Sequence, residues 1–281
     1  MFYDLKLTRR EAIVKTGTAI AALPLTGKSV LAQITELDGF DSIWRDTEEA
    51  LRYFFGKVNY FSSGIQLIIP RHAEVGRSVP ITVKVDCEMN KFDYPKVVHV
   101  LANKNPGPHV MSAYFLPEAG KAEFSTRIRL EQSQVVTVAA KISDGRHIRV
   151  DKFVDVSFGA CGQDGAGDRD TVAKFKPIAK IRVPSHAIKD EIMLIRTLIS
   201  HPMETGLRLD VGRGVIEARF ISAFRCEYNG VSVFRARLHP AIAANPYFSF
   251  YARANESGLI KFSWYDMTNI NYKKSSRIIV S

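Results

Sequence analysis

Residues 221–238 read ISAFRCEY-NG-VSVFRARL, two runs in which apolar and polar residues alternate on either side of Asn229-Gly230. Alternation with a period of two places the apolar side chains on one face of a β-strand. Asn-Gly favours the tight turn that joins two antiparallel strands. The stretch therefore predicts a β-hairpin with one buried face, and it indicates a fold that is rich in β-structure.

The same alternation recurs on both sides of this hairpin. Ser143-Asp144-Gly145 is a turn signal between two of the runs. Short strands separated by turns every 8–12 residues or so are typical of β-sandwiches. The expected strands cover residues 81–87, 124–130, 135–141 and 148–157 in a first block, and residues 178–183, 191–200, 215–226, 231–238, 247–253, 259–266 and 277–280 in a second.

A segment of different composition separates the two blocks. Residues 159–170 read GACGQDGAGDRD, which is rich in glycine and aspartate and has no apolar period. Such a segment cannot build a core, so we expect a flexible linker over residues 159–174. The predicted domains are residues 33–158 and 175–281, and each is long enough to fold around a core of its own.

One amphipathic helix is expected ahead of the first strands, over residues 41–55. Apolar residues recur there at three- and four-residue spacing, which places them on one helical face. This face comprises Phe40, Ile43, Trp44, Thr47, Leu51 and Phe54. The fold class expected from all these patterns is mainly β: two immunoglobulin-like β-sandwich domains with an N-terminal amphipathic helix.

Residues 1–32 have the three-part pattern of a signal peptide. Arg9-Arg10 precedes a weakly apolar stretch over residues 12–25, and small residues at 30–32 provide a cleavage site. The paired arginines and the modest hydrophobicity favour the twin-arginine route, which would place the protein in the periplasm. The alternative is the first helix of a cytosolic protein, and the lack of acidic residues over 12–35 argues against it.

The composition limits the classes of partner. The 281-residue chain carries a net charge of +10, of which residues 33–281 keep +7, because residues 1–32 contain five basic and two acidic side chains. This balance fits an anionic cargo, acidic partner proteins or simple solubility. No basic run interleaved with aromatic residues occurs, so we expect no nucleic-acid partner. No apolar run is long enough for a membrane span, so we expect no membrane partner.

The chain contains three cysteines, and an odd number in an exported protein leaves at least one thiol without an intramolecular partner. Cys161 lies in the predicted linker, where Gly159, Ala160 and Gly162 would form a flexible arm that leaves the sulfur unshielded. No histidine adjoins it in the sequence to act as its base. Cys87 and Cys226 share predicted strand faces with apolar residues, so they are expected to fill the core.

We expect no catalytic residues, no metal site and no cofactor. The seven histidines show no close spacing typical of metal ligands, and no CxxC motif occurs. His201 and Met203 could ligate a haem or a copper ion, but a turn between two strands explains the stretch His201–Gly206 equally well. No nucleophile–base pair or phosphate-binding loop is visible.

Both blocks resemble the subunits of SoxYZ, the periplasmic carrier of the thiosulfate-oxidising system. In the first block the resemblance to SoxY rests on Asn105-Pro106, Ser125–Arg129, Asp144-Gly145 and Gly159–Gly162. In the second block the resemblance to SoxZ rests on Ser200–Gly206, Asn229-Gly230, Ala243–Tyr247 and Phe250. Ala160 and Gln163 replace glycines of the SoxY carrier arm, and the cysteine is internal rather than close to a free C-terminus.

The resemblance implies a covalent carrier without catalytic machinery of its own. Cys161 would hold a sulfur-containing group, and periplasmic Sox-type enzymes or cytochromes would act on that group. It also implies intramolecular pairing of the SoxY-like and SoxZ-like domains, and the exposed thiol could link two chains by a disulfide. Single-chain fusions resemble a group associated with quinoprotein dehydrogenases, so the alternative is an adaptor protein of such a system in which Cys161 is vestigial.

Overall fold

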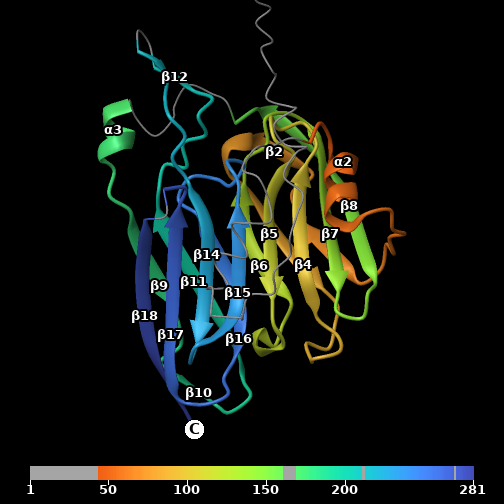
Figure 1. Ribbon diagram of the computed structural model, residues 1–281, viewed down its shortest axis with the longest axis vertical. Helices are drawn as coiled ribbons and strands as arrows, with labels where there is room; N and C mark the ends of the chain where they lie inside the picture. The colour runs from red at the N-terminus through yellow and green to blue at the C-terminus, as the bar shows by residue number, and fades with distance from the viewer. Residues whose placement is uncertain (1–43, 161–168, 211–212, 269) are drawn as a thin grey trace, which may run out of the picture. The chain divides into compact units, whose positions relative to one another are not determined.

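The computed structural model describes residues 44–160, 169–210, 213–268 and 270–281. Two large β-sheets pack face to face, and the helix α2 (Thr47–Phe55) lies against the larger one (Figure 1). The strands before the linker are β1 (Ile65–Ile68), β2 (His72–Val75), β3 (Val79–Val85), β4 (Pro95–Ala102), β5 (His109–Phe115), β6 (Glu123–Ile128), β7 (Gln134–Ile142) and β8 (His147–Phe158).

The second half begins with a short helix, α3 (Arg169–Lys174), which lies inside the span predicted as a linker. The predicted boundaries of the linker, at residues 159 and 174, and those of the two domains remain predictions. The strands that follow are β9 (Ile178–Arg182), β10 (His186–Ala187), β11 (Ile192–Ser200), β12 (Leu209–Asp210), β13 (Gly214–Val215), β14 (Ile221–Tyr228), β15 (Val231–Leu238), β16 (Tyr247–Arg253), β17 (Gly258–Asp266) and β18 (Asn271–Val280).

Each half of the chain contributes strands to both sheets. The ten-stranded sheet has the order β10-β18-β17-β14-β15-β5-β4-β7-β8-β2, and the six-stranded sheet has the order β1-β3-β6-β16-β11-β9. The halves therefore meet twice, where β15 pairs with β5 and where β16 pairs with β6. The prediction of a mainly β fold with two immunoglobulin-like sandwiches and an N-terminal helix is confirmed. The sandwiches are joined edge to edge, so that their sheets are continuous.

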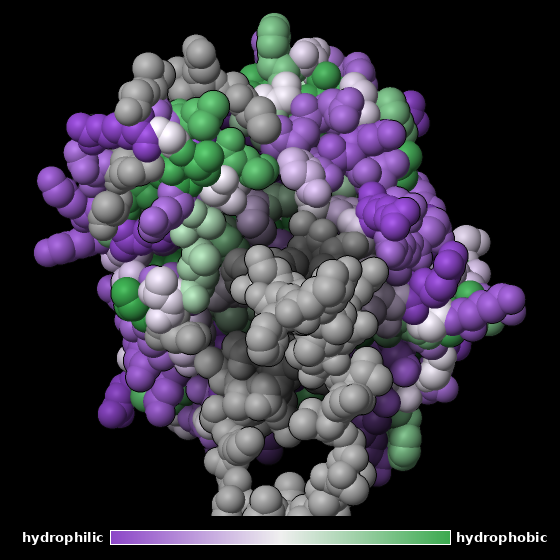
Figure 2. All heavy atoms as spheres, turned by 45° about the horizontal axis from the view of Figure 1, so that its top comes forward, coloured by the Kyte–Doolittle hydropathy of each residue, from purple (hydrophilic) through white to green (hydrophobic). Residues whose placement is uncertain are grey.

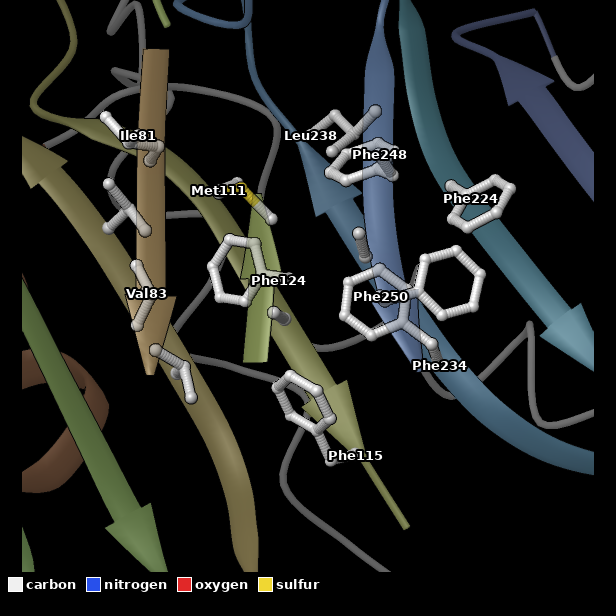
Figure 3. Close-up of a cluster of buried hydrophobic side chains, with 14 of the residues drawn as sticks. Ile81, Val83, Met111, Phe115, Phe124, Phe224, Phe234, Leu238, Phe248 and Phe250 are labelled. Carbon is white, nitrogen blue, oxygen red and sulfur yellow. The ribbon is translucent and has the colours of Figure 1, made fainter. Parts of the chain in front are cut away.

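One hydrophobic core runs across this junction. Phe234 on β15 lies between aromatic rings of both halves, and its ring centroid is 5.2 Å from that of Phe115 and 4.6 Å from that of Phe250. Figure 3 shows these side chains pointing into the space between the two sheets. The two sandwiches thus share buried apolar surface as well as backbone hydrogen bonds.

The predicted hairpin is present as β14 and β15. Asn229 and Gly230 both have positive φ, 48° and 85°, as the two central residues of a type I′ turn require. The prediction of one strand over 215–226 is wrong in one respect, because Val215 belongs to the exposed strand β13 and β14 begins only at Ile221. The expected strand over 81–87 likewise ends at Val85.

The helix begins later than expected. Asp46 caps α2 by accepting a hydrogen bond from the backbone N–H of Glu49 at 2.8 Å, and the Glu49 carboxylate accepts one from the N–H of Arg45 at 2.7 Å. This reciprocal arrangement fixes the start of a helix. Residues 44–46 of the predicted helix therefore precede it, and residues 40–43 of the prediction lie outside the described residues. Trp44 still packs with Leu51 against β4 and β7.

Within the described residues, no helix is long and apolar enough to cross a membrane.

Candidate functional site: the two ends of the Cys161 segment

Cys161 and Gly162 lie outside the described residues, so the site is built from the residues at either end of 161–168. Strand β8 ends at Phe158, and the next two residues are held against the loop that follows β6. The backbone N–H of Ala160 donates a hydrogen bond to the carbonyl oxygen of Leu130 at 3.1 Å. Cys161 comes directly after this anchored residue in the sequence.

Glycine is required at position 159 because the backbone of the loop passes very close. A Cβ atom there would lie 2.0 Å from the carbonyl oxygen of Glu131, and one at Gly76 would lie 2.0 Å from that of Leu130. Leu130 also donates from its N–H to the carbonyl of Gly76 at 2.8 Å. The segment Leu130–Glu131 is thus enclosed by two glycines. Gly159, expected to contribute flexibility to an arm, also serves close packing.

Replacing Gly159 with alanine should displace this anchor. The added Cβ cannot fit without moving backbone, so we expect a loss of about 1–3 kcal/mol in the free energy of unfolding. Urea denaturation monitored by tryptophan fluorescence measures it. Gly145→Ala is a comparison variant that has strain from a positive φ of 98° but nothing within 4 Å of its Cβ. Equal losses in the two variants would contradict the packing explanation.

Asn105 fixes the shape of the loop that anchors Ala160. Its side-chain oxygen accepts hydrogen bonds from the N–H of Glu131 at 3.0 Å and from Nε2 of Gln134 at 2.9 Å, and its Nδ2 donates to the carbonyl of Arg129 at 2.9 Å. Both the oxygen and the nitrogen of this amide are therefore used, in three hydrogen bonds. The Asn105-Pro106 motif supports the point at which the Cys161 segment leaves the sheet.

Arg129 ties the same loop to the second half of the chain. Its guanidinium donates to the carbonyl oxygens of Met203 at 2.7 Å, Pro240 at 2.9 Å and Pro202 at 3.2 Å. The N–H of Arg129 also bonds to the carbonyl of Ala241 at 2.7 Å. The stretch Ser125–Arg129 of the first half therefore meets the stretch Ser200–Gly206 of the second.

The other end of the Cys161 segment is also anchored. Arg219 donates from its guanidinium to the carbonyl oxygens of Val172 and Phe175, the latter at 3.1 Å. Arg213 pairs with Asp170 of α3 at 3.1 Å, and the side chain of Val172 is buried. Residues 161–168 thus connect one fixed point on the first half to a second fixed point on the other half.

Exposed apolar side chains lie close to both fixed points. Phe158 is 68% exposed beside its strand partner Val75. Leu209 is 70% exposed opposite Val215 on the hairpin β12–β13, which Arg213 connects to α3. Figure 2, which turns the top of Figure 1 forward, shows a patch of hydrophobic residues at the upper left with hydrophilic residues on both sides of it. Exposed apolar side chains of this kind suit contact with another protein.

A histidine that the sequence did not associate with Cys161 lies near its segment. The parallel pairing of β2 with β8 places His72 opposite Asp155, with Nδ1 and the carboxylate 3.0 Å apart. The Nε2 atom of His72 is 3.4 Å from the hydroxyl of Ser157. The group is exposed, and no local sequence signal could have identified it, since His72 and Asp155 are 83 residues apart.

The other two cysteines are shielded. Cys226 is fully buried in the core, as expected, and burial raises the pKa of its thiol well above the ordinary value. Cys87 is half-buried in the bend after β3 rather than on the strand, and burial raises its pKa to about 11. Neither thiol is therefore poised to react as a thiolate near neutral pH.

Three histidines that are far apart in the sequence come together beneath α2. His99 and His109 lie 2.9 and 3.0 Å from the hydroxyl of Ser112, and the rings of His109 and His239 are 4.3 Å apart. Phe54 of α2 stacks on His99 at 3.9 Å. Even so, no group of three or more His, Cys, Asp or Glu side chains in the described residues is arranged to hold a metal ion.

Acid should destabilise the fold through these histidines. Burial lowers the pKa of His99 and of His239 to about 3, and it lowers that of His109 well below 6.5. The unfolded chain binds these protons near pH 6.5, so the free energy of unfolding should fall as the pH drops below 6.5. The expected loss is roughly 1.4 kcal/mol per pH unit for each histidine.

Urea denaturation at pH 7.5 and pH 5.0 measures this loss. In His99→Gln, the free energy of unfolding should depend less on pH, because the contribution of one of the three histidines is removed. His186→Gln, at an exposed position, should leave it unchanged. Suppose that the free energy of unfolding differs between pH 7.5 and pH 5.0 by the same amount in the wild type and in both variants. That result would show that groups other than His99 cause the pH dependence.

His201 and Met203 are used inside the fold. The Nδ1 atom of His201 accepts a hydrogen bond from the N–H of Met203 at 3.0 Å, and the sulfur of Met203 accepts one from the N–H of Ile221 at 3.3 Å. Both side chains are fully buried, and burial lowers the pKa of His201 to about 4. These contacts agree with the interpretation of His201–Gly206 as a turn rather than as a pair of ligands.

Part of the chain is similar to proteins of solved structure. Among solved structures, the sulfur carrier protein SoxY from Chlorobium limicola f thiosulfatophilum is 27% identical, over 39% of this chain and 94% of that chain, with a TM-score of 0.34. A superoxide reductase (neelaredoxin) from Ignicoccus hospitalis is 17% identical, over 40% of this chain and 92% of that chain, with a TM-score of 0.30. No curated protein gave a significant match.

The family matches cover the two halves of the chain. Residues 51–161 match the sulfur oxidation protein SoxY, and residues 181–277 match the sulphur oxidation protein SoxZ. The first match ends at Cys161, and the second begins within β9. The chain is therefore a fusion of a SoxY domain and a SoxZ domain of the sulfur-oxidation proteins.

Proposed function

We propose that the protein is a periplasmic carrier that holds a sulfur-containing group covalently on Cys161 and presents it to partner enzymes. The observation that carries this proposal is the SoxY match that ends at Cys161 and is followed in the same chain by SoxZ. The burial of Cys226 and the raised pKa of Cys87 leave Cys161 as the thiol suited to this role.

The cargo enters by oxidative conjugation. The Cys161 thiol and thiosulfate form a sulfur–sulfur bond that gives Cys–S–S–SO₃⁻, and one proton and two electrons are released. The electrons pass to a haem enzyme that is the oxidant, and other partners then hydrolyse or oxidise the tethered group. Tethering raises the effective concentration of the cargo, so the carrier contributes presentation rather than catalysis.

The anchored ends limit how the thiol is presented. Ala160, the residue that precedes Cys161 in the sequence, stays at the Leu130 carbonyl while its hydrogen bond is intact. A partner active site must therefore approach this surface, or that bond must open. The exposed Phe158 and Leu209 offer apolar contact for such an approach.

Mass spectrometry of the protein purified from its native host, grown on a reduced sulfur compound, tests the proposal. We expect a peptide that contains Cys161 with an added thiosulfonate or sulfur-containing mass that a reducing agent removes. The peptides of Cys87 and Cys226 serve as internal controls and should carry no adduct. Unmodified Cys161 under these conditions would instead favour an adaptor role in a quinoprotein dehydrogenase system.

Export by the twin-arginine route is part of the same proposal. Replacing Arg9-Arg10 with Lys-Lys should leave the precursor in the cytoplasm, because this route depends on the paired arginines. Cell fractionation followed by immunoblotting measures the distribution. Replacing Lys6 with Arg is the matched control and should not alter export. Normal arrival of the Lys-Lys variant in the periplasm would contradict the proposed route.

A further inference from the structure

The outer face of the six-stranded sheet carries a group of cations without acidic partners. Arg127 on β6, Arg196 on β11, and Lys180 and Arg182 on β9 are all exposed, and each alternates with inward-facing residues of its own strand. We call these four residues the basic face. In the part of the chain that the structure describes, none of them forms an ion pair with a carboxylate.

The strand register places these residues in adjacent rows. Arg196 lies directly opposite Arg182 on one side and Ser249 on the other. In the neighbouring row, Lys180 lies opposite Leu198, which pairs with Tyr247. The guanidinium of Arg127 lies over the ring of Tyr247, 5.6 Å from its centroid. The basic face is therefore a continuous surface of arginine, lysine, tyrosine and serine across three strands and the edge strand β9.

This arrangement has a local cost to stability. Two like charges directly opposite each other on neighbouring strands repel, and nothing acidic lies between Arg182 and Arg196. Some cations elsewhere on the molecule do have acidic partners. Arg149 pairs with Glu48 at 2.7 Å, and Arg225 pairs with Glu227 at 2.6 Å, both on the ten-stranded sheet.

Protection of a sheet edge does not account for the whole group. Charged residues on an edge strand hinder unwanted strand pairing, which explains Lys180 and Arg182 on β9. Arg196 and Arg127, however, are on interior strands of the sheet. Edge protection therefore does not explain these two cations.

We propose that the basic face docks an acidic surface of a partner protein. Arginine and tyrosine are enriched in protein interfaces, and cations without acidic partners complement a surface of carboxylates. Strand β9 follows α3 closely in the chain, so a partner docked here would sit beside the C-terminal anchor of the Cys161 segment. The inference goes beyond the carrier role and does not rest on the thiol.

Binding of poly-L-glutamate, a chain of carboxylates, tests the proposal on the full-length protein by surface plasmon resonance in 50 mM salt. We expect Arg182→Glu with Arg196→Glu to weaken binding about tenfold or more, since exposed charges set such contacts and salt screens them. Lys273→Glu with Lys274→Glu on β18 makes the same change in net charge at exposed positions on the other sheet. This control should weaken binding less than threefold.

A stability measurement separates docking from folding. Arg182→Glu alone places a carboxylate opposite Arg196, so it should raise the unfolding midpoint by about 1–3 °C while weakening binding. The proposal would be overturned if the Lys273→Glu and Lys274→Glu pair weakened binding of poly-L-glutamate as much as the Arg182→Glu and Arg196→Glu pair. Binding would then follow net charge alone. The proposal would also be overturned if the Arg182→Glu and Arg196→Glu pair lost binding to duplex DNA or anionic vesicles but kept binding to poly-L-glutamate.

Discussion

Replacing Cys161 with serine should abolish rapid alkylation of the folded protein and should leave its thermal midpoint almost unchanged. Cys226 is fully buried, and burial raises the pKa of Cys87 to about 11, so neither side chain offers a reactive thiolate at pH 8. Cys161 would therefore supply nearly all of the reactive thiolate. Without a reductant, two chains should also join through Cys161, and the serine variant should remain monomeric on a non-reducing gel.

Mass spectrometry after brief treatment with iodoacetamide identifies the labelled cysteine. Cys87→Ser is the matched control, and it should be labelled at Cys161 as fast as the wild type. Faster labelling of Cys87 or Cys226, or unfolding of the Cys161→Ser variant, would show that Cys161 is structural. The carrier proposal would then lose its chemical group.

The sequence was sufficient to predict strands that have one buried and one exposed face. The predicted ranges 231–238 and 247–253 coincide with β15 and β16, and the burial of β16 alternates residue by residue. It was not sufficient for β4 and β5, which are buried on nearly every residue. Their outer faces lie under α2 and the histidine cluster, so the hydrophobic period of two is lost.

The candidate site was predictable only where its signal is local. Cys161 and its glycines stand out in the sequence, and the family match ends at that residue. The anchors of the segment were not predictable, because Arg129 and Arg219 bind backbone carbonyls far away in the chain. The histidine cluster was missed for the same reason: its members are on three different strands or strand ends, and only the joined sheet brings them together.

The joined core makes the two halves depend on each other. Phe234 belongs to the SoxZ half, yet its ring contacts Phe115 and Phe124 of the SoxY half at centroid distances of 5.2 and 6.0 Å (Figure 3). It also stacks on Phe250 at 4.6 Å. Removing the ring would leave a cavity shared by both halves, and the surrounding sheets cannot collapse to fill it.

Phe234→Ala should therefore lower the free energy of unfolding by about 3–5 kcal/mol and the thermal midpoint by roughly 10 °C. Differential scanning calorimetry measures both, and Phe153→Ala, at a position that is 61% exposed, should change neither appreciably.

A specific protease site placed at Arg169 adds a direct test of the junction. The cleaved wild type should elute from a sizing column as one species, because β5–β15 and β6–β16 pairing persists. The cleaved Phe234→Ala protein should separate into halves at lower urea concentration than the cleaved wild type, and separation of the cleaved wild type in plain buffer would contradict a shared core.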